Sequence, residues 1–312
     1  MEKVTVSIVC DVYNHEPYLR QCLDGFVMQK TDFPFEILIS DDASTDKSAD
    51  IIKEYVSKYP SLFKPIYQSE NQFSQGVGIW SDIQFPRATG KYIAICEGDD
   101  FWTDPLKLQK QVDILEADES LMACCTNSSL VDKEGTLIEE KLSRPVVPDN
   151  KEGKYTLREF FEQNHTYPTA SMVFRRTHFD EICEKFRKTR NPFLGDWTLW
   201  IAILCFGNMY YLDEVTCAYR INPTSVTHSK VDERRLGLAK ANFKILPAVA
   251  SILPEEGFED IKDDLRYNTA WLWFQLANAY RHLHKYFHMA GCILICGIQN
   301  PKYLYSKLRN RK

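Results

Sequence analysis

The chain has 312 residues, more than one hydrophobic core usually fills, so we expect one large domain with an appendage or two domains. Apolar residues (44%) and charged residues (26%) are at the levels of an ordinary globular protein. The ten cysteines include no Cys-x-x-Cys pair, which argues against a disulfide framework and for a reducing cytosol. The sequence begins directly with a strand-like run, so we expect no signal peptide. The longest uncharged apolar run, 289–298, is far below the roughly 20 residues that span a bilayer.

The net charge of −5 hides a strong asymmetry. All 43 acidic residues lie at or before Asp264, whereas residues 265–312 contain eight Lys or Arg and no Asp or Glu. The last segment therefore carries +8 and the rest of the chain −13. Such a split predicts a C-terminal segment that faces an anionic surface.

Strand and helix patterns alternate through the first 130 residues. Apolar β-branched runs predict buried strands at 4–10, 35–40, 62–67, 91–96 and 121–127. Helical spacing predicts a helix over 16–29, a second that Ser44 or Thr45 caps and Pro60 stops, and a third that Pro105 begins. The alternation predicts an α/β fold with a mostly parallel sheet that helices flank on both faces.

The second half of the chain is less regular. Residues 128–154 are expected to form a hairpin and a loop. Helices are expected at 156–163, 177–188 and 195–206, and strands near 169–175, 208–212 and 215–220. From Asp232 the pattern is helical, with breaks at 254–257 and 300–301. We therefore predict a domain over 1–230 and a helical, basic appendage over 231–312.

The most informative stretch is 91–104, where the apolar run Tyr92–Cys96 brings Glu97, Asp99 and Asp100 to one point. Packed carboxylates at the end of a buried strand are costly unless a positive group neutralises them. Mg²⁺ and Mn²⁺ prefer oxygen ligands, and α/β sheets bind nucleotides at the carboxyl ends of their strands. The stretch thus predicts a metal and nucleotide-phosphate site. The alternative is an acidic surface turn with Asp99 as a helix cap.

Four blocks in this order resemble family 2 glycosyltransferases. They are Val6–Asn14, Glu36–Asp46, Gly90–Ala94 and Glu97–Asp100, within residues 4–130. The segments Gly195–Trp197 and Tyr211–Arg220 resemble the acceptor half of the same family. The resemblance implies a GT-A fold, a nucleotide-sugar donor, a divalent metal (Mn²⁺ or Mg²⁺) and inversion at the anomeric carbon.

The resemblance also implies donor-binding and metal-binding residues. Asp11, Tyr13 and Asp42 would line the base pocket, although Asp42 could instead cap the helix at 46–58. One of Asp99 and Asp100 would bind the metal, and the other would contact the ribose or the metal's water. Glu97 stands where the family usually has Asp, and its longer side chain predicts a water-mediated contact.

Several further residues are candidates for the site, and most of them have two possible roles. Asp196 is the expected general base by resemblance, or a helix N-cap. His228 is a further metal or phosphate ligand, or an exposed loop residue. Arg220 pairs with phosphate or with Asp213, and Arg87 and Lys91 are candidate phosphate contacts. Trp197 and Trp200 stack on a sugar face or pack in the core.

These interpretations combine into one hypothesis, a metal-dependent inverting glycosyltransferase. It would move a sugar from a UDP-sugar to a glycan or lipid-linked acceptor in cell-surface polysaccharide synthesis. We expect a cytoplasmic protein, peripheral on the inner membrane face through its C-terminal helices, with no nucleic-acid partner. One rival is a nucleotidyltransferase, which the lack of a Gly-rich basic loop at Asp11–Glu16 disfavours. Another is a catalytically inactive sugar-nucleotide or membrane-binding module.

Overall fold

A computed structural model describes residues 3–142, 151–162, 167–189, 195–221, 245–255, 258–262, 269–302 and 304–305, together with 236 and 240. The chain divides into two compact units. The first comprises Met1–Arg187 and Ala202–Ile221, and the second comprises Lys188–Ile201 and Asn222–Lys312. The boundary that we expected near residue 230 lies outside the described residues, and the division there stays a prediction.

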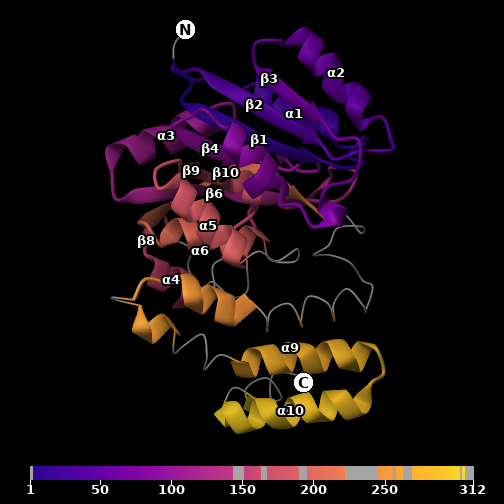
Figure 1. Ribbon diagram of the computed structural model, residues 1–312, viewed down its shortest axis with the longest axis vertical. Coiled ribbons are helices and arrows are strands. Elements are labelled where there is room, and N and C mark those ends of the chain that lie inside the picture. The colour runs from indigo at the N-terminus through magenta and orange to yellow at the C-terminus, as the bar shows by residue number, and fades with distance from the viewer. Residues whose placement is uncertain are drawn as a thin grey trace. The chain divides into compact units, whose positions relative to one another are not determined.

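The first unit is built on a mixed sheet of ten strands among the described residues, of which eight run in the order β3-β2-β1-β4-β9-β6-β10-β5. Figure 1 shows β3, β2, β1 and β4 in succession. β7 pairs with β6, and β8 pairs with β10, outside this path. The strands are β1 (Val6–Val12), β2 (Phe35–Asp41), β3 (Phe63–Tyr67), β4 (Tyr92–Ile95), β5 (Phe101–Trp102), β6 (Leu121–Val131), β7 (Leu137–Glu139), β8 (Gly153–Tyr155), β9 (Val173–Arg175) and β10 (Asn208–Arg220).

The helices that lie between strands in the sequence are α1 (Leu19–Val27), α2 (Ser48–Lys58), α3 (Lys107–Ala117), α4 (Leu157–Glu162), α5 (Phe179–Thr189) and α6 (Gly195–Leu204). Two further helices, α9 (Thr269–His282) and α10 (Tyr286–Gln299), follow the last strand. Four short helical turns lie in the first unit: η1 (Phe73–Gln75), η2 (Ile79–Gln84), η3 (Phe85–Arg87) and η4 (Thr169–Ser171). In the second unit, residues 245–252 and 259–262 are also helical.

Pairing directions explain how the strand ends meet. β3, β2, β1 and β4 are mutually parallel, and β6 is parallel to β10. β9 joins the two groups and is antiparallel to both β4 and β6. Because β1 lies between β2 and β4, the carboxyl ends of these three strands lie at one edge of the sheet.

Both faces of the sheet are covered, as the apolar pattern predicts. One face packs against α1, α2 and α3 in a core that includes Ile8, Phe26, Ile52 and Leu108. On the other face, Phe85 makes edge-to-face contacts with Phe174 of β9 and Phe179 of α5. The helices therefore hold the sheet from both sides and leave its carboxyl edge to the loops.

Three local predictions need correction. Neither Ser44 nor Thr45 caps α2, because that helix begins at Ser48 and its N-cap position is Lys47. The segments 208–212 and 215–220 form one strand, β10, whose pairing with β6 shifts register at Leu212–Val215. The C-terminal helix expected up to residue 300 is interrupted at residues 283–285, between α9 and α10.

In the second unit, α9 and α10 lie side by side (Figure 1). Leu276 and Ala277 of α9 pack against Cys292 of α10, and Phe274 packs against Cys296. No helix within the described ranges is both long enough and apolar enough to cross a membrane.

Candidate active site at the carboxyl edge of the sheet

The carboxyl edge of β1, β2 and β4 gathers the acidic residues that the sequence singled out. Val12 pairs with Asp41 across β1 and β2, and the N–H of Asp42 donates to the carbonyl oxygen of Val12 at 2.9 Å. On the other side of β1, the N–H of Gly98 donates to the carbonyl oxygen of Asp11 at 3.1 Å. The backbone itself thus places Asp11 between the turn at 41–42 and the turn at 97–100.

Gly98 is required by this close approach. A Cβ atom at this position would lie 2.7 Å from Nδ1 of His15 and 3.1 Å from Cγ2 of Val12. A side chain at position 98 would therefore force the side chains of His15 and Val12 to shift, which favours glycine in this turn.

Asp11 is held by Gln84, a residue that the sequence analysis missed. The amide Nε2 of Gln84 donates to Oδ1 of Asp11 at 3.1 Å and to the carbonyl oxygens of Cys10 and Leu38. Burial raises the pKa of Asp11 to about 8, the charges of Glu97 and Asp42 add to the rise, and the bond from Gln84 opposes it. Asp11 can therefore take up a proton near neutral pH.

Asp42 has a structural role that differs from both sequence interpretations. Its Oδ1 accepts the N–H of Gln72 at 2.7 Å, and its Oδ2 accepts the N–H of Phe73 at 3.1 Å. The carboxylate is buried and fastens the loop that carries η1. It does not cap α2, so that alternative is wrong. The base-pocket role of Asp42 stays a prediction.

Three exposed aromatic rings border the same edge. Tyr13 follows β1, as expected, while Tyr67 at the end of β3 and Phe73 in η1 were not predicted. Tyr67 pairs with Asp41, and the N–H of Phe73 binds Asp42. Exposed rings beside strand-end carboxylates can stack on a planar base.

The turn after β4 is fixed by contacts from two distant segments. Oδ1 of Asp100 accepts the N–H of Arg220 at 2.8 Å, and the carbonyl oxygen of Asp99 accepts Nε of Arg220 at 2.7 Å. Oε2 of Glu97 accepts the hydroxyl of Thr169. Burial raises the pKa of Asp100 well above its usual range, and the charges of Asp99 and Glu97 raise it further.

The guanidinium of Arg220 donates hydrogen bonds to neighbouring segments of the fold and not to Asp213. Besides Asp99, it donates to the carbonyl oxygens of Asp132 and Lys133 and to Oε1 of Gln21. The predicted pairing with Asp213 is wrong, because Asp213 binds Lys141 instead, with 2.8 Å between Nζ and Oδ2.

The residues at 97–100 fit a divalent metal of the Mg²⁺ type. No group of three His, Cys, Asp or Glu side chains is arranged to hold a metal among the residues that the structure describes. Mg²⁺, however, is usually bound by one or two carboxylates together with substrate phosphates and water. A buried Asp100 whose charge is disfavoured by its neighbours is the group that such a cation would stabilise.

The other candidate residues are placed as follows. Arg87 donates to Oε1 of Gln84 and to the carbonyl oxygen of Lys64, so its guanidinium already has two partners within the fold. Lys91 precedes β4, at the opposite end from the carboxylates, and forms an exposed ion pair with Glu116. This position argues against a phosphate contact by Lys91.

Asp196, the expected general base, lies in the first turn of α6, where its Oδ1 accepts the N–H of Trp197 at 2.7 Å.

The second unit contains three further candidate residues, His228, Trp197 and Trp200. His228, the predicted ligand, lies outside the described residues. Trp200 is almost fully buried, which favours a packing role, whereas Trp197 is partly exposed.

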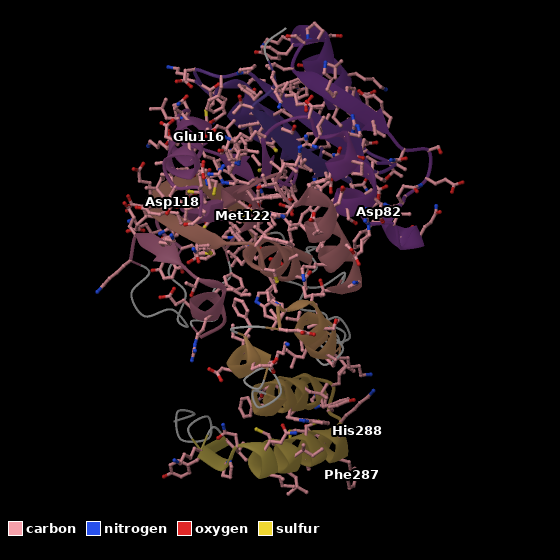
Figure 2. The ribbon with its side chains drawn as sticks, turned by 60° about the vertical axis from the view of Figure 1, so that its left-hand side comes forward. Asp82, Glu116, Asp118, Met122, Phe287 and His288 are labelled. Atoms are coloured by element: carbon pink, nitrogen blue, oxygen red, sulfur yellow. The ribbon has the colours of Figure 1, made fainter. Side chains whose placement is uncertain are left out.

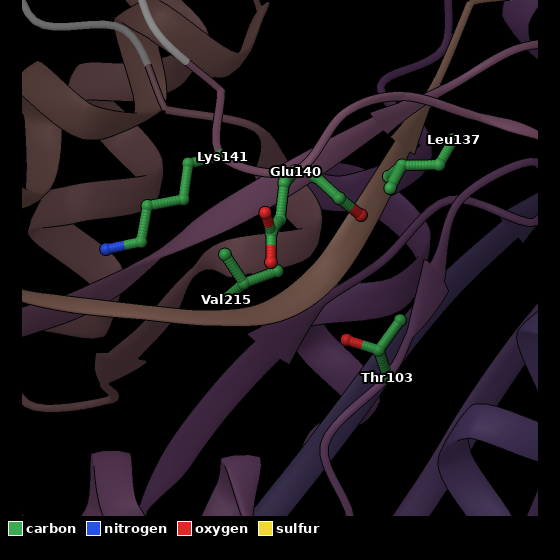
Figure 3. Close-up of a pocket in the computed structure, with 6 residues that line it drawn as sticks. Thr103, Leu137, Glu140, Lys141 and Val215 are labelled. Atoms are coloured by element: carbon green, nitrogen blue, oxygen red, sulfur yellow. The ribbon is translucent and has the colours of Figure 1, made fainter.

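A separate hollow of about 610 Å³ lies on the first unit beside the hairpin of β6 and β7 (Figure 3). It is lined by Thr103, Ser129, Leu137, Glu140, Lys141 and Val215. Thr103 follows Asp100 by three residues, so their Cα atoms are at most about 11 Å apart. One residue that lines the hollow therefore lies near the turn that carries Asp99 and Asp100.

Comparison with known proteins agrees with this geometry. Residues 7–183 match the model of glycosyl transferase family 2. An uncharacterized protein of Mycobacterium tuberculosis is 35% identical over 233 residues, which are 74% of this chain and 62% of that protein. This chain therefore spans about three fifths of the length of that relative.

Two solved structures have the same fold. S. aureus TarS 1-349 in complex with UDP-GlcNAc superposes with a TM-score of 0.55 at 16% identity, covering 88% of this chain and 81% of that one. The mannosyltransferase PcManGT from Pyrobaculum calidifontis, in complex with GDP-Man and Mn²⁺, gives a TM-score of 0.58 at 16% identity, covering 99% and 79%.

The fold is of the GT-A type, an α/β architecture with a helical C-terminal region, as the sequence predicted. The family model covers more than half of the chain, and the chain belongs to glycosyl transferase family 2.

Proposed function

We propose that the chain is a metal-dependent inverting glycosyltransferase that transfers a sugar from a UDP-sugar to a hydroxyl group of a glycan or lipid-linked acceptor. The observation that carries the proposal is the meeting of Asp11, Asp42, Glu97, Asp99 and Asp100 at the carboxyl edge of one sheet. This edge is where α/β sheets bind nucleotides.

The donor nucleotide would lie along the ends of β1 and β2. Tyr13 stacks on the base, and Asp11 accepts a hydrogen bond from it when the carboxyl is ionised. Asp42 contributes by holding the loop of η1 in place. Asp99 and Asp100 would hold Mn²⁺ or Mg²⁺, with His228 as a further ligand, and the ion when bound neutralises charge on the leaving nucleoside diphosphate.

The transfer itself is a single displacement. Asp196 accepts the proton of the acceptor hydroxyl, and the oxygen attacks the anomeric carbon on the face opposite the donor diphosphate. The bond from the anomeric carbon to the diphosphate oxygen breaks, and its electron pair stays on the diphosphate. The hollow lined by Glu140 and Lys141 takes part of the acceptor, because Thr103, which also lines it, follows Asp100 by only three residues. We place this reaction in the cytoplasm, in the synthesis of a surface polysaccharide.

Nucleotide-dependent stabilisation tests the donor half of the proposal. We would measure thermal unfolding with UDP and GDP, each with and without Mn²⁺, because ligands of TarS and PcManGT carry these two nucleotides. Ligand at a hundredfold excess over its Kd stabilises the native state by about 2.7 kcal/mol. We expect stabilisation by UDP with Mn²⁺ that Asp99→Asn and Asp100→Asn abolish, and that the exposed control Asp50→Asn retains.

Turnover separates the mechanism from its rivals. UDP-sugars and a glycan or lipid extract are incubated with the chain, and the released nucleotide is identified. UDP release that Asp196→Asn abolishes, with nucleotide-dependent stabilisation intact, supports the proposal. Pyrophosphate release would indicate a nucleotidyltransferase. Donor binding without any turnover would indicate an inactive sugar-nucleotide-binding module.

A further inference from the structure

Helix α10 is an uncharged helix that, among the residues that the structure describes, is buried on one side. Its 14 residues, Tyr286–Gln299, contain no Asp, Glu, Lys or Arg. Cys292 and Cys296 are buried against α9, and Met289 and Ile293 are partly buried there. The helix packs against α9 with this side, and the residues on its opposite side are exposed.

The opposite side is an exposed apolar stripe, formed by Phe287, Ala290, Gly291, Leu294 and Ile298. At 100° per residue these positions fall within an arc of about 100°, on the side away from Cys292 and Cys296. Phe287 is 96% exposed, Leu294 65% and Ile298 72%. Figure 2 labels Phe287 at the beginning of the stripe, beside His288. Large apolar side chains aligned in this way mark an interaction surface rather than scattered surface residues.

The described Lys and Arg residues that flank α10 in the sequence have no acidic residue among them. Lys285 precedes α10, Lys302 follows it, Arg281 lies near the end of α9, and all three are exposed. The sequence from 265 to 312 adds five more Lys or Arg and no acidic residue. An apolar helix side bordered by basic residues is the pattern of a helix that lies in an anionic membrane interface.

We propose that α10 docks this chain on an anionic lipid surface, with the stripe inserted among the acyl chains and the basic residues at the headgroups. The helix would lie in the interface rather than span it, because 14 residues extend only about 21 Å and the hydrocarbon core is about 30 Å thick. Charge favours lipid over a symmetric contact between the stripes of two copies of this chain, because two acid-free segments of +8 repel each other.

Co-sedimentation of the full chain with vesicles tests the docking. We expect binding to vesicles of phosphatidylglycerol and phosphatidylcholine, and much weaker binding to phosphatidylcholine alone. Ile298→Ser and Leu294→Ser should each weaken binding by about tenfold. Lys302→Gln should weaken it by about fivefold at low salt. The matched control is Ile138→Ser, which removes an apolar side chain that is 51% exposed on β7, and should leave binding unchanged.

Every variant is also checked for thermal unfolding and for its mass in solution. Equal losses in Ile138→Ser and Ile298→Ser, or no binding to anionic vesicles, would overturn the proposal. So would a dimeric wild-type chain that Leu294→Ser converts to monomers, because the stripe would then be a self-association surface. Vesicle binding is measured without donor or acceptor, so its failure is distinct from a failure of glycosyl transfer.

Discussion

The backbone N–H of Arg220, at the end of β10, donates a 2.8 Å hydrogen bond to Oδ1 of Asp100, which lies 120 residues earlier in the chain. The side chain of Arg220 reinforces this contact through Asp99, Gln21 and the hairpin at 132–133. Its guanidinium also lies 4.8 Å from the ring centroid of Tyr18 and 5.3 Å from that of Phe101. Arg220 is thus a positioning residue that connects the turn of Asp99 and Asp100 to β10 and α1.

Replacing Arg220 by lysine should loosen this turn without removing the charge. Lysine cannot reproduce the planar fork of donors, so several buried carbonyl oxygens lose their partners. We expect a loss of about 2–4 kcal/mol in the free energy of unfolding, measured by urea denaturation. Stabilisation by UDP with Mn²⁺ should weaken as well.

Arg20→Lys is the control, because Arg20 makes a bidentate pair with Glu54 at the exposed surface. We expect little change in its stability or nucleotide binding. If both arginine variants behaved alike, the buried contacts of Arg220 would not hold the turn.

Asp42→Asn should destabilise the chain even when no nucleotide is present. Both carboxylate oxygens of Asp42 accept backbone N–H groups, and the amide nitrogen of asparagine cannot accept either of them. One buried N–H is left unpaired, which costs about 1–3 kcal/mol in urea denaturation. The exposed Asp50→Asn serves as the control. Unchanged stability with weakened UDP binding would instead assign the carboxylate chiefly to the nucleotide.

Much of the sheet could be predicted from the sequence, because β1, β2, β3, β4 and the first half of β6 are rich in apolar residues and lie between turn residues. β5 could not, since a strand of two residues has no periodic signal. The sequence predicts two strands in place of β10, because Asp213 and Glu214 interrupt its apolar pattern. The strand continues through an irregular pairing with β6 that absorbs these residues.

The acidic residues of the site could be predicted, because they follow recognisable strands directly. Their partners could not be predicted from local pattern. Gln84 binds Asp11 from 73 residues away, Thr169 binds Glu97 from 72, and Lys141 binds Asp213 from 72. Hydrogen bonds between distant segments depend on the tertiary fold. A single polar residue in a loop has no local pattern that predicts its partner.

Ala43→Gly should stabilise the chain. Ala43 lies in the turn after Asp42 and has a φ of 60°, in the left-handed region that costs a side-chain-bearing residue about 1–2 kcal/mol. Glycine removes this cost but gains entropy in the unfolded chain, so we expect a net gain of up to about 1 kcal/mol. Ala49→Gly, in the first turn of α2, is a control that should lose up to about 1 kcal/mol. A loss of stability in both variants would contradict the strain at Ala43.

Lys107 in α3 gives a prediction about pH, because its ammonium group is fully buried. Nζ donates to Oε1 of Gln111 and to the carbonyl oxygen of Ser171, and it lies 4.7 Å from the ring centroid of Trp102. Burial lowers the pKa of Lys107. The folded chain therefore releases this proton at a lower pH than the unfolded chain does.

The sign of the effect follows from proton linkage. At pH values between the lowered pKa of Lys107 in the folded chain and the ordinary lysine pKa of about 10.4, the unfolded chain binds more protons than the folded chain. The contribution of Lys107 to the free energy of unfolding therefore rises with pH over this range. In urea denaturation between pH 7 and pH 10, the wild type should gain stability relative to Lys107→Met as pH rises. Lys53→Met, at an exposed lysine paired with Asp50, should show no such gain. A constant difference between wild type and Lys107→Met over this range would mean that Lys107 keeps its proton in the folded chain.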